Sequence, residues 1–298
     1  MKTLFAIAFC LFSSVAAAQT NCVQTAREVS PQLSTETQRD FETKLNEARA
    51  LFEKDRRSAD RIIWLGRRTA YLGRYKDAIK IYTDGIKQFP SDARLYRHRG
   101  HRYITLRCFD DAVADFEKAS KLMKGRPDEI EPDGLPNPRN IPTSTLQSNV
   151  WYHLGLAHYL KGDFQRALNA YREAEKVSTN ADMLVATTHW LYMTLRRLGR
   201  EEEASKLVAG IKDDLDVIEN ADYYNLIKVY QGKLKPADVW KEPAESLSNA
   251  TVGYGLGNWF LYNGQKAEAM KVFRQVTSGN QWASFGYIAA ESELKRAP

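Results

Sequence analysis

The chain has 298 residues, of which 43% are hydrophobic and 27% are charged. This composition is typical of folded globular proteins and argues against overall disorder. The net charge of +6 is too modest to indicate a nucleic-acid partner, so the local clustering of charge is more informative than the total.

The first 18 residues have the features of a secretory signal peptide. Lys2 gives a positive start, residues 4–15 form a short apolar run, and small residues precede a cleavage site after Ala18. The run is shorter than the roughly 20 residues that cross a bilayer, and no later stretch is long and apolar enough to do so. We therefore expect a periplasmic or secreted protein with a cleaved signal peptide at 1–18 and no integral membrane segment.

Two cysteines, Cys22 and Cys108, remain after such a cleavage. In an oxidising compartment they could form a disulfide that ties the N-terminal segment to the folded body, or they could stay free. The sequence gives no distance between them, so both alternatives remain open. A lipid anchor is not expected, because Phe9 and Asn21 stand where a lipoprotein needs a small residue directly before its modified cysteine.

Residues 36–54 form the first predicted helix. Phe41, Leu45 and Ala48 recur there at helical spacing, which predicts an amphipathic helix that caps the structure after it. The same spacing of apolar residues recurs at 282–296 and predicts a C-terminal capping helix.

A 34-residue pattern recurs between these two caps. Each unit tends to have Leu-Gly at positions 7 and 8, Gly at position 15, aromatic residues at positions 17 and 24, and a small residue at position 20. Units begin near positions 59, 93, 148, 185 and 250, and the unit at 148–181 matches best. Its matching residues are Trp151, Leu154, Gly155, Gly162, Phe164, Ala167, Tyr171 and Ala174. The second unit departs from the pattern at Arg99 and Arg107, where Leu and Gly are expected.

The pattern resembles the tetratricopeptide repeat, and the resemblance covers most of the mature chain. It implies an all-α superhelical solenoid of about five to six helix pairs with N- and C-terminal capping helices. The small residues at positions 8 and 20 would let paired helices approach closely, the glycine at 15 would end the first helix, and the aromatic residues would fill the space between units. Because no pair can bury its apolar face alone, the pairs are expected to stack.

This resemblance divides the chain into seven segments. They are the signal peptide (1–18), an N-terminal segment with the capping helix (19–58), repeats one and two (59–126), a Pro-rich insertion (127–147), repeats three and four (148–218), an eroded helical pair (219–249), and repeat five with the C-terminal cap (250–298).

The insertion stands out because residues 125–147 hold five of the ten prolines, so this stretch cannot be helical throughout. It also exceeds the usual helix–helix connection of about 2–8 residues. It is either an ordered loop beside the groove or a mobile surface loop.

A search for catalytic and metal motifs favours a protein that is not an enzyme. The sequence has no Gly-rich phosphate loop, Gly-x-Ser-x-Gly elbow, His-Glu-x-x-His helix or Cys-x-x-Cys pair. His98 and His101 share a helix face, but the arginines around them oppose a metal cation. The acidic run at 128–133 lacks the regular spacing of a calcium loop. We therefore expect no cofactor and no metal site.

The resemblance also implies a set of groove residues, because the first helices of tetratricopeptide repeats line the concave side. The implied groove residues are Arg67, Tyr71, Arg94, Arg97, His101, Tyr152, Tyr159, His189, Arg196, Arg197, Tyr254, Asn258 and Tyr262. Such a groove is basic at one end and aromatic further along, which suits an extended acidic segment. Alternatively, the arginines are solvated or pair internally with acids such as Asp110, Asp111 and Asp115. Arg99 and Arg102 point elsewhere by register, and for Arg99 we expect an internal salt bridge, with the acidic insertion as one candidate partner.

The arrangement of repeats is also similar, more loosely, to periplasmic tetratricopeptide lipoproteins that act as adaptors for envelope proteases, although the lipid anchor is missing here. We predict an exported, non-catalytic scaffold or adaptor that binds an acidic protein segment in its groove. One alternative is a hydrolytic or glycan-acting envelope enzyme, which would need carboxylates of the insertion close to His101 or His158. Another is a structural subunit that associates with itself.

Overall fold

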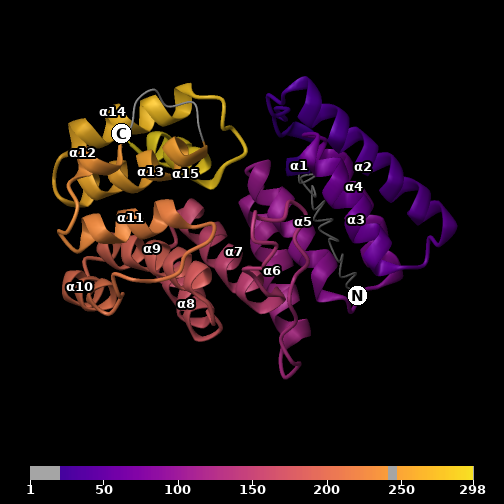
Figure 1. Ribbon diagram of the computed structural model, residues 1–298, viewed down its shortest axis with the longest axis horizontal. Coiled ribbons are helices and arrows are strands. Elements are labelled where there is room, and N and C mark those ends of the chain that lie inside the picture. Colours follow the sequence, from indigo (N-terminus) through magenta and orange to yellow (C-terminus); the bar gives the residue numbers. More distant parts are fainter. Residues whose placement is uncertain (1–20, 241–246, 298) are drawn as a thin grey trace, which may run out of the picture.

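The computed structural model describes residues 21–240 and 247–297. The described residues form helices and no strand, which confirms the predicted all-α fold (Figure 1). The helices are α1 (Cys22–Thr25), α2 (Thr35–Lys54), α3 (Ala59–Tyr71), α4 (Tyr75–Gln88), α5 (Ala93–Thr105), α6 (Phe109–Met123), α7 (Leu146–Lys161), α8 (Phe164–Lys176), α9 (Ala181–Arg197), α10 (Glu201–Ala209), α11 (Ala221–Tyr230), α12 (Pro236–Val239), α13 (Leu247–Tyr262), α14 (Lys266–Ser278) and α15 (Phe285–Arg296). The predicted signal peptide at 1–18 lies outside the described residues.

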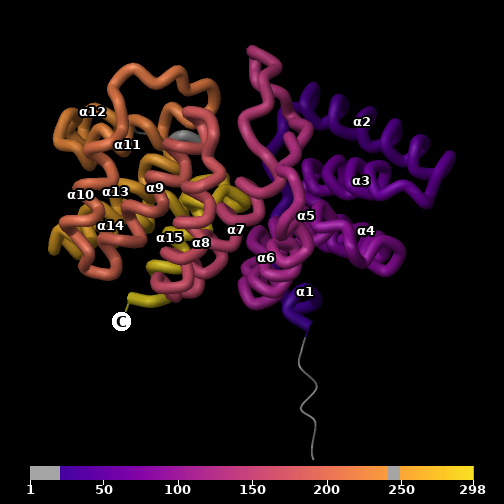
Figure 2. The backbone as a smooth tube through the Cα atoms, turned by 90° about the horizontal axis from the view of Figure 1, so that it is seen from below, coloured from indigo at the N-terminus to yellow at the C-terminus, as the bar shows by residue number. Residues whose placement is uncertain are grey.

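None of the helices in the described part of the chain is both long enough and apolar enough to cross a lipid bilayer. Each predicted repeat forms two helices joined by a short turn (Figure 2). In the best-matching repeat, α7 ends at Lys161 and Gly162 adopts the left-handed conformation, with φ 84°, that favours a residue without Cβ. The glycine of the repeat pattern therefore marks the turn between paired helices.

Arg107 occupies this turn position in the second repeat and also takes a left-handed conformation, with φ 65°. Such a conformation is unfavourable for a residue with a side chain and persists only where surrounding contacts fix it. Arg107 Nε lies 2.7 Å from Glu291 Oε2, Nη2 donates to the carbonyl oxygen of Trp282 at 2.9 Å, and the guanidinium lies 3.9 Å from the centroid of the Trp282 ring. The departure from Gly therefore links the second repeat to the C-terminal cap.

The small residue at position 8 of a repeat lies against the aromatic residue at position 24 of the same repeat. A Cβ added to Gly155 would lie 2.7 Å from the ring of Tyr171, and one added to Gly66 would lie 2.4 Å from the ring of Tyr82. The close approach of paired helices was predicted, but the position of this aromatic was not. It fills the space within a pair, rather than the space between neighbouring pairs as the pattern suggested, because the glycine leaves room there for a ring.

Both predicted caps are present, with small shifts. Helix α2 starts after Ser34, whose hydroxyl accepts the N–H of Thr37 at 3.1 Å, and its Leu45 packs in one cluster with Leu65. Helix α15 starts at Phe285, three residues later than predicted, because Ser284 caps it. In the eroded segment, α11 is followed by the four-residue α12, and residues 241–246 lie outside the described part.

The C-terminal half closes on itself, and α15 holds it together. Helix α15 packs against α13 and α14 and also touches α7. Arg296 Nη2 donates to the carbonyl oxygens of Tyr159 and Leu160 at 3.1 and 2.6 Å, and Arg197 Nη1 donates to Glu293 at 2.7 Å. One hydrophobic core runs from α5 and α6 through α15. The space that an open solenoid would leave on the inner side of these repeats is therefore occupied by the chain itself.

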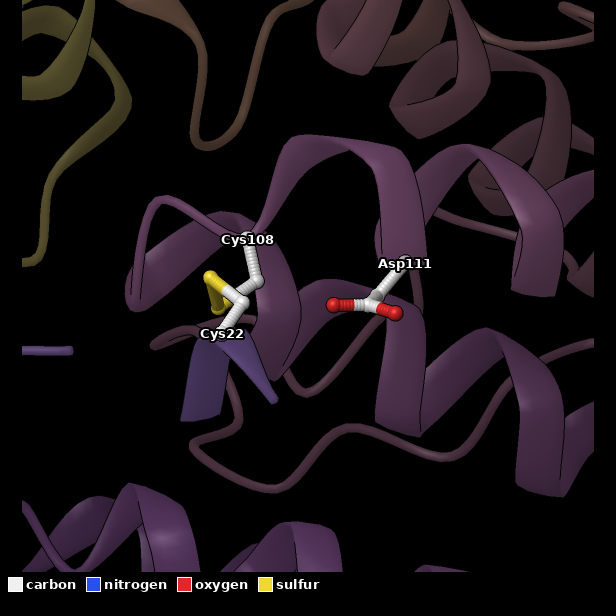
Figure 3. A group of neighbouring side chains, drawn as sticks. All are labelled: Cys22, Cys108 and Asp111. Atoms are coloured by element: carbon white, nitrogen blue, oxygen red, sulfur yellow. A yellow bond between two sulfur atoms is a disulfide. The ribbon is translucent and has the colours of Figure 1, made fainter. Parts of the chain in front are cut away.

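Cys22 and Cys108 are joined in a disulfide, with Cα atoms 5.7 Å apart, that ties α1 to the residue before α6 (Figure 3). Asp111 lies close to both sulfurs, and its carboxylate and the two sulfur atoms are within 4.8 Å of one another. Metal ions bind thiolate sulfur, which a disulfide does not offer. The three residues are therefore not a metal site while the disulfide is intact.

We expect the double substitution Cys22→Ser and Cys108→Ser to lower the free energy of unfolding by about 2–4 kcal/mol, because the disulfide restricts the unfolded chain over 86 residues. Urea denaturation followed by circular dichroism measures the loss. Wild-type protein treated with a reductant should give the same midpoint as the double variant. A variant as stable as the oxidised wild type would show that the disulfide contributes nothing.

Candidate functional site

Five of the predicted groove residues are buried inside the C-terminal half, and their assignment to an open groove is wrong. They are Tyr152, Tyr159, His189, Tyr254 and Asn258. The hydroxyl of Tyr254 and the amide of Asn258 each donate to the hydroxyl of Tyr159 at 2.9 Å, so α13 contacts α7 directly. His189 stacks on Tyr223 with ring centroids 4.7 Å apart. The prediction of these groove residues assumed an open superhelix. In the structure the first helices of the repeats pack on one another instead.

Arg196, Arg197 and Tyr262 also make internal contacts. Arg197 donates to the buried carboxylate of Glu293, and the guanidinium of Arg196 lies 4.5 Å from the centroid of the Tyr262 ring. Arg196 Nη2 also donates to Asn263 at 3.1 Å. For Arg197 the alternative of internal pairing is therefore correct. These residues fix the ends of α9 and α13 and do not line a peptide channel.

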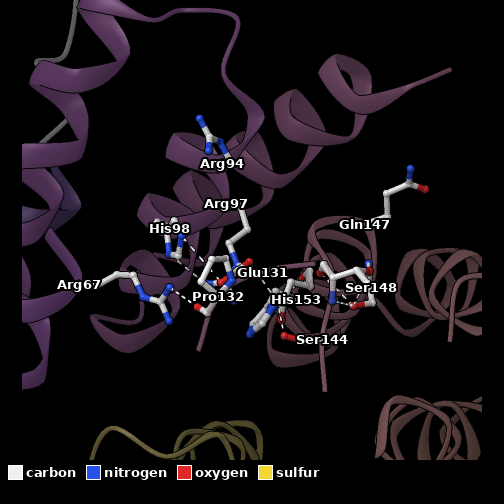
Figure 4. Close-up of polar contacts among 12 residues, drawn as sticks. Arg67, Arg94, Arg97, His98, Glu131, Pro132, Ser144, Gln147, Ser148 and His153 are labelled. Carbon is white, nitrogen blue, oxygen red and sulfur yellow. Dashed lines mark hydrogen bonds and ion pairs between the residues drawn. The ribbon is translucent and has the colours of Figure 1, made fainter. Parts of the chain in front are cut away.

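The remaining predicted groove residues lie on α3 and α5, and the insertion contacts two of them, Arg67 and Arg97 (Figure 4). Arg97 Nε lies 2.9 Å from Glu131 Oε2, with side chains only 9% and 11% exposed. The N–H of this nitrogen is not well aligned with the oxygen, so the contact is an ion pair by distance and not a good hydrogen bond. His98 Nε2 lies 3.8 Å from the other oxygen of Glu131, and the Asn149 amide donates to the carboxylate at 3.1 Å. An acidic side chain of the insertion is therefore held on the basic helix of repeat two.

The backbone of the insertion is held as well. Arg67 Nη1 donates to the carbonyl oxygen of Pro132 at 2.6 Å, and Arg68 Nη1 donates to that of Gly134 at 2.9 Å. A short antiparallel bridge pairs Ile130 with Thr145. The insertion is therefore an ordered loop beside the predicted groove residues, which is the first of the two alternatives that the sequence left open. We refer to Arg67, Arg68, Arg94 and Arg97 on α3 and α5 as the basic face.

The other arginines of α5 differ in how their charges are balanced. Arg94 pairs with Asp60 and Asp92, both at 2.6 Å. Arg99 makes two hydrogen bonds to Asp115, at 2.7 and 2.8 Å, so the expected internal salt bridge exists, but its partner is on α6 and not on the insertion. Burial raises the pKa of Asp115, and the neighbouring Arg99 opposes that shift. Arg94 and Arg99 therefore have carboxylate partners within the chain itself.

The histidines beside the basic face are held neutral. Burial lowers the pKa of His98 well below its ordinary value, and the Arg97 charge lowers it further. Burial and the Arg102 charge do the same for His101, whose ring lies 4.8 Å from that of His153. The enzyme alternative needed carboxylates of the insertion at His101 or His158. Among the described residues, the ion-pair contacts of the insertion carboxylates with histidine reach only His98.

Sequence reasoning missed three residues of this site. Glu131 of the insertion pairs with Arg97 on α5, and Arg68 on α3 donates to the carbonyl oxygen of Gly134 in the insertion. Arg102 lines the same cavity as Arg67 and Arg97, although the register placed it elsewhere. The acidic insertion next to a basic helix was a visible signal for Glu131. Neither Arg68 nor Arg102 had such a signal, because their positions depend on how α3 and α5 pack together.

Comparisons with known proteins find similarity to tetratricopeptide-repeat proteins. A family model of the tetratricopeptide repeat matches residues 148–181, the unit that the sequence pattern marks as best. The chain is 26% identical over 137 residues to the BBSome complex member BBS4 of Bos taurus, a match that spans 46% of this chain and 22% of that relative's length. Among solved structures it is similar to YrrB, described as a TPR protein with an unusual peptide-binding site, with 15% identity, a TM-score of 0.45, and coverage of 84% of this chain and 98% of that one. It is also similar to MamA, with 16% identity, a TM-score of 0.44, and coverage of 59% and 91%.

Proposed function

We propose that this chain, a tetratricopeptide-repeat protein with an all-α superhelical fold, is an exported, non-catalytic scaffold whose basic face binds an extended acidic segment of a partner protein. Tetratricopeptide folds serve as protein-interaction scaffolds and are generally non-catalytic. The basic face is the part of the predicted groove that supports this role, because the aromatic part is buried in the C-terminal half.

The observation that carries the proposal is the contact between the basic face and the insertion. One carboxylate, that of Glu131, meets Arg97, and two backbone carbonyls, those of Pro132 and Gly134, accept from Arg67 and Arg68. These contacts need only an extended backbone and one acidic side chain. An acidic segment of a partner presents the same groups, and guanidinium forks are well suited to donate hydrogen bonds to them.

The export part of the proposal is supported by two features. Residues 1–18 have the composition of a signal peptide, and the Cys22–Cys108 disulfide suits an oxidising compartment. We propose a periplasmic or extracellular location. Mass spectrometry of the protein recovered from the expressing cell's periplasm or medium should give a chain that starts at Gln19, and a chain retaining residues 1–18 in the cytoplasm would contradict the location.

A peptide copied from the chain tests the binding function. Residues 128–143 would be replaced by a Gly-Ser linker of equal length, which frees the basic face, and the peptide DEIEPDGLP (128–136) would be titrated in trans by calorimetry. We expect saturable binding. A peptide with glutamine in place of Glu131 should bind at least about 10-fold more weakly, because it leaves the buried guanidinium of Arg97 without its anion.

The matched protein control is Arg97→Gln in the same linker variant, which should weaken binding of the acidic peptide and bring it level with the glutamine peptide. Circular dichroism would show that the variants keep their helices. Equal affinity for the two peptides, or equal affinity with and without Arg97, would reject the basic face as an acidic-segment site.

A further inference from the structure

A second feature beneath the insertion is a small cavity of about 110 Å³ between α3 and α5. Three guanidiniums line it, those of Arg67, Arg97 and Arg102. The other lining residues are Ala70, Tyr71, Tyr82, His98, His101 and Glu131. We call it the basic cavity. Arg67, Tyr71, His101 and Arg102 are half-buried, so the cavity sits at the edge of the folded body.

The charges of the basic cavity do not balance. Glu131 pairs with Arg97, which leaves two of the three guanidiniums without a carboxylate. Arg67 donates its hydrogen bonds to neutral oxygens, which are the Pro132 carbonyl oxygen and, at 3.4 Å, the Tyr71 hydroxyl. Arg102 makes no ion pair or hydrogen bond through its side chain to any described residue, and its guanidinium lies 5.8 Å from the centroid of the Tyr75 ring. The cavity therefore carries an excess of two positive charges.

The histidines do not change this balance in either direction. Burial, followed by the charges of Arg97 and Arg102 respectively, lowers the pKa of His98 and His101 well below the ordinary value, so both rings are neutral at pH 7. Burial also lowers the pKa of Arg102 itself, which reflects a guanidinium withdrawn from water without an anion beside it. A charge in such a place is costly unless it is paired and hydrogen-bonded.

The dimensions and donors of the cavity define what would pair with it. A water molecule occupies about 30 Å³ in the liquid, so the cavity has room for a group of several heavy atoms. Guanidiniums present their N–H donors in a planar fork that fits two oxygens of one carboxylate or phosphate. The side chains of Tyr71 and Tyr82 line the same space, and a tyrosine hydroxyl can donate a hydrogen bond to an oxyanion.

We propose that the basic cavity binds a small oxyanion, a phosphate or a carboxylate, through Arg67 and Arg102. The site shares Arg67, Arg97 and Glu131 with the contact that carries the proposed function, whereas Arg102 belongs to the cavity alone. Glu131 competes with the anion, because its negative charge already satisfies Arg97 in the same cavity.

Titration of the mature protein with inorganic phosphate at pH 7 and low ionic strength, followed by calorimetry, tests the proposal. We expect saturable binding that Arg102→Gln weakens at least 10-fold, because each charged hydrogen bond contributes enough to give about that ratio. Glu131→Gln should strengthen binding several-fold, because it removes the competing negative charge. Arg139→Gln, which removes an exposed arginine paired with Asp216 outside the cavity, should leave the phosphate affinity unchanged.

The acidic peptide described above separates the two sources of the anion. If phosphate and peptide compete, the oxyanion arrives as a side chain of a bound partner; if both bind at once, the cavity takes a free anion. Arg102→Lys, which keeps the charge, guards against a folding defect and should retain part of the affinity. The proposal is overturned if neither probe binds with an affinity that depends on Arg102, even where the peptide still depends on Arg97.

Discussion

Replacing Glu293 with glutamine is expected to lower the free energy of unfolding by about 3 kcal/mol, because the change removes a buried carboxylate that pairs with two half-buried guanidiniums. The Glu293 side chain is 3% exposed and receives hydrogen bonds from both Arg197 and Arg296. Glutamine keeps the volume but removes the charge, so the loss comes from electrostatics and not from a cavity. Urea denaturation followed by circular dichroism measures it.

The matched control is Glu201→Gln. Glu201 is the first residue of α10, is 71% exposed and lies 3.4 Å from Arg196 near the end of α9, so removal of its charge should cost less than about 1 kcal/mol. If both variants lose the same small amount, the contacts of Arg197 and Arg296 with Glu293 do not hold α15 in place. A large loss for Glu293→Gln alone would show that closure of the C-terminal half depends on this carboxylate.

That closure is the feature that the sequence could not reveal. The 34-residue pattern is local, and it correctly predicted the helix pairs, the turn at Gly162 and the close approach at Gly155. Each of these depends on residues within one repeat. The contact between Arg197 and Glu293 joins residues 96 apart, and the contact between Tyr159 and Asn258 joins residues 99 apart. No spacing rule within one repeat encodes such contacts.

The candidate site was predictable in part for the same reason. The basic helix and the acidic insertion are both visible in the sequence, and their charges are complementary. The contact of Arg97 with Glu131, however, could not be distinguished from a contact with Asp128, Glu129 or Asp133, because a Pro-rich loop has no periodic register. The prediction of the aromatic part of the groove was wrong, because first helices line an accessible concave side only in an open superhelix.

The two halves of the molecule consequently differ in what they can offer a partner. The C-terminal half uses its inner residues for its own core, whereas the basic face is covered by a loop with few apolar contacts. A partner segment that takes the place of this loop must displace it, so its apparent affinity is reduced by the fraction of molecules in which the loop is bound. If the basic face binds an acidic segment as proposed, the insertion lowers the apparent affinity of that binding.

The largest pH effect is expected from the buried histidines. Its size follows from His153 and His189, and His98 and His101 add to it in the same direction. Burial lowers the pKa of His189 to about 3, and burial followed by the Arg97 charge lowers that of His153 to about 3. In the unfolded chain a histidine has a pKa of about 6.5, so between these values the unfolded state binds a proton that the folded state does not. The free energy of unfolding must then fall as the pH falls below about 6.5, with a loss of about 2 kcal/mol for each histidine, or about 4 kcal/mol for both, between pH 7 and pH 5.

Urea denaturation at pH 7 and at pH 5 measures this loss, and His189→Gln provides the control. The substitution itself lowers stability at both pH values, because it disturbs the stack of His189 on Tyr223 and the hydrogen bond between His189 Nδ1 and the Tyr230 hydroxyl. It should also reduce the difference between the two pH values by about 2 kcal/mol, since one group that titrates only in the unfolded state has been removed. An unchanged difference would mean that His189 accepts its proton in the folded protein, and the helix packing around it would then have to admit a charge.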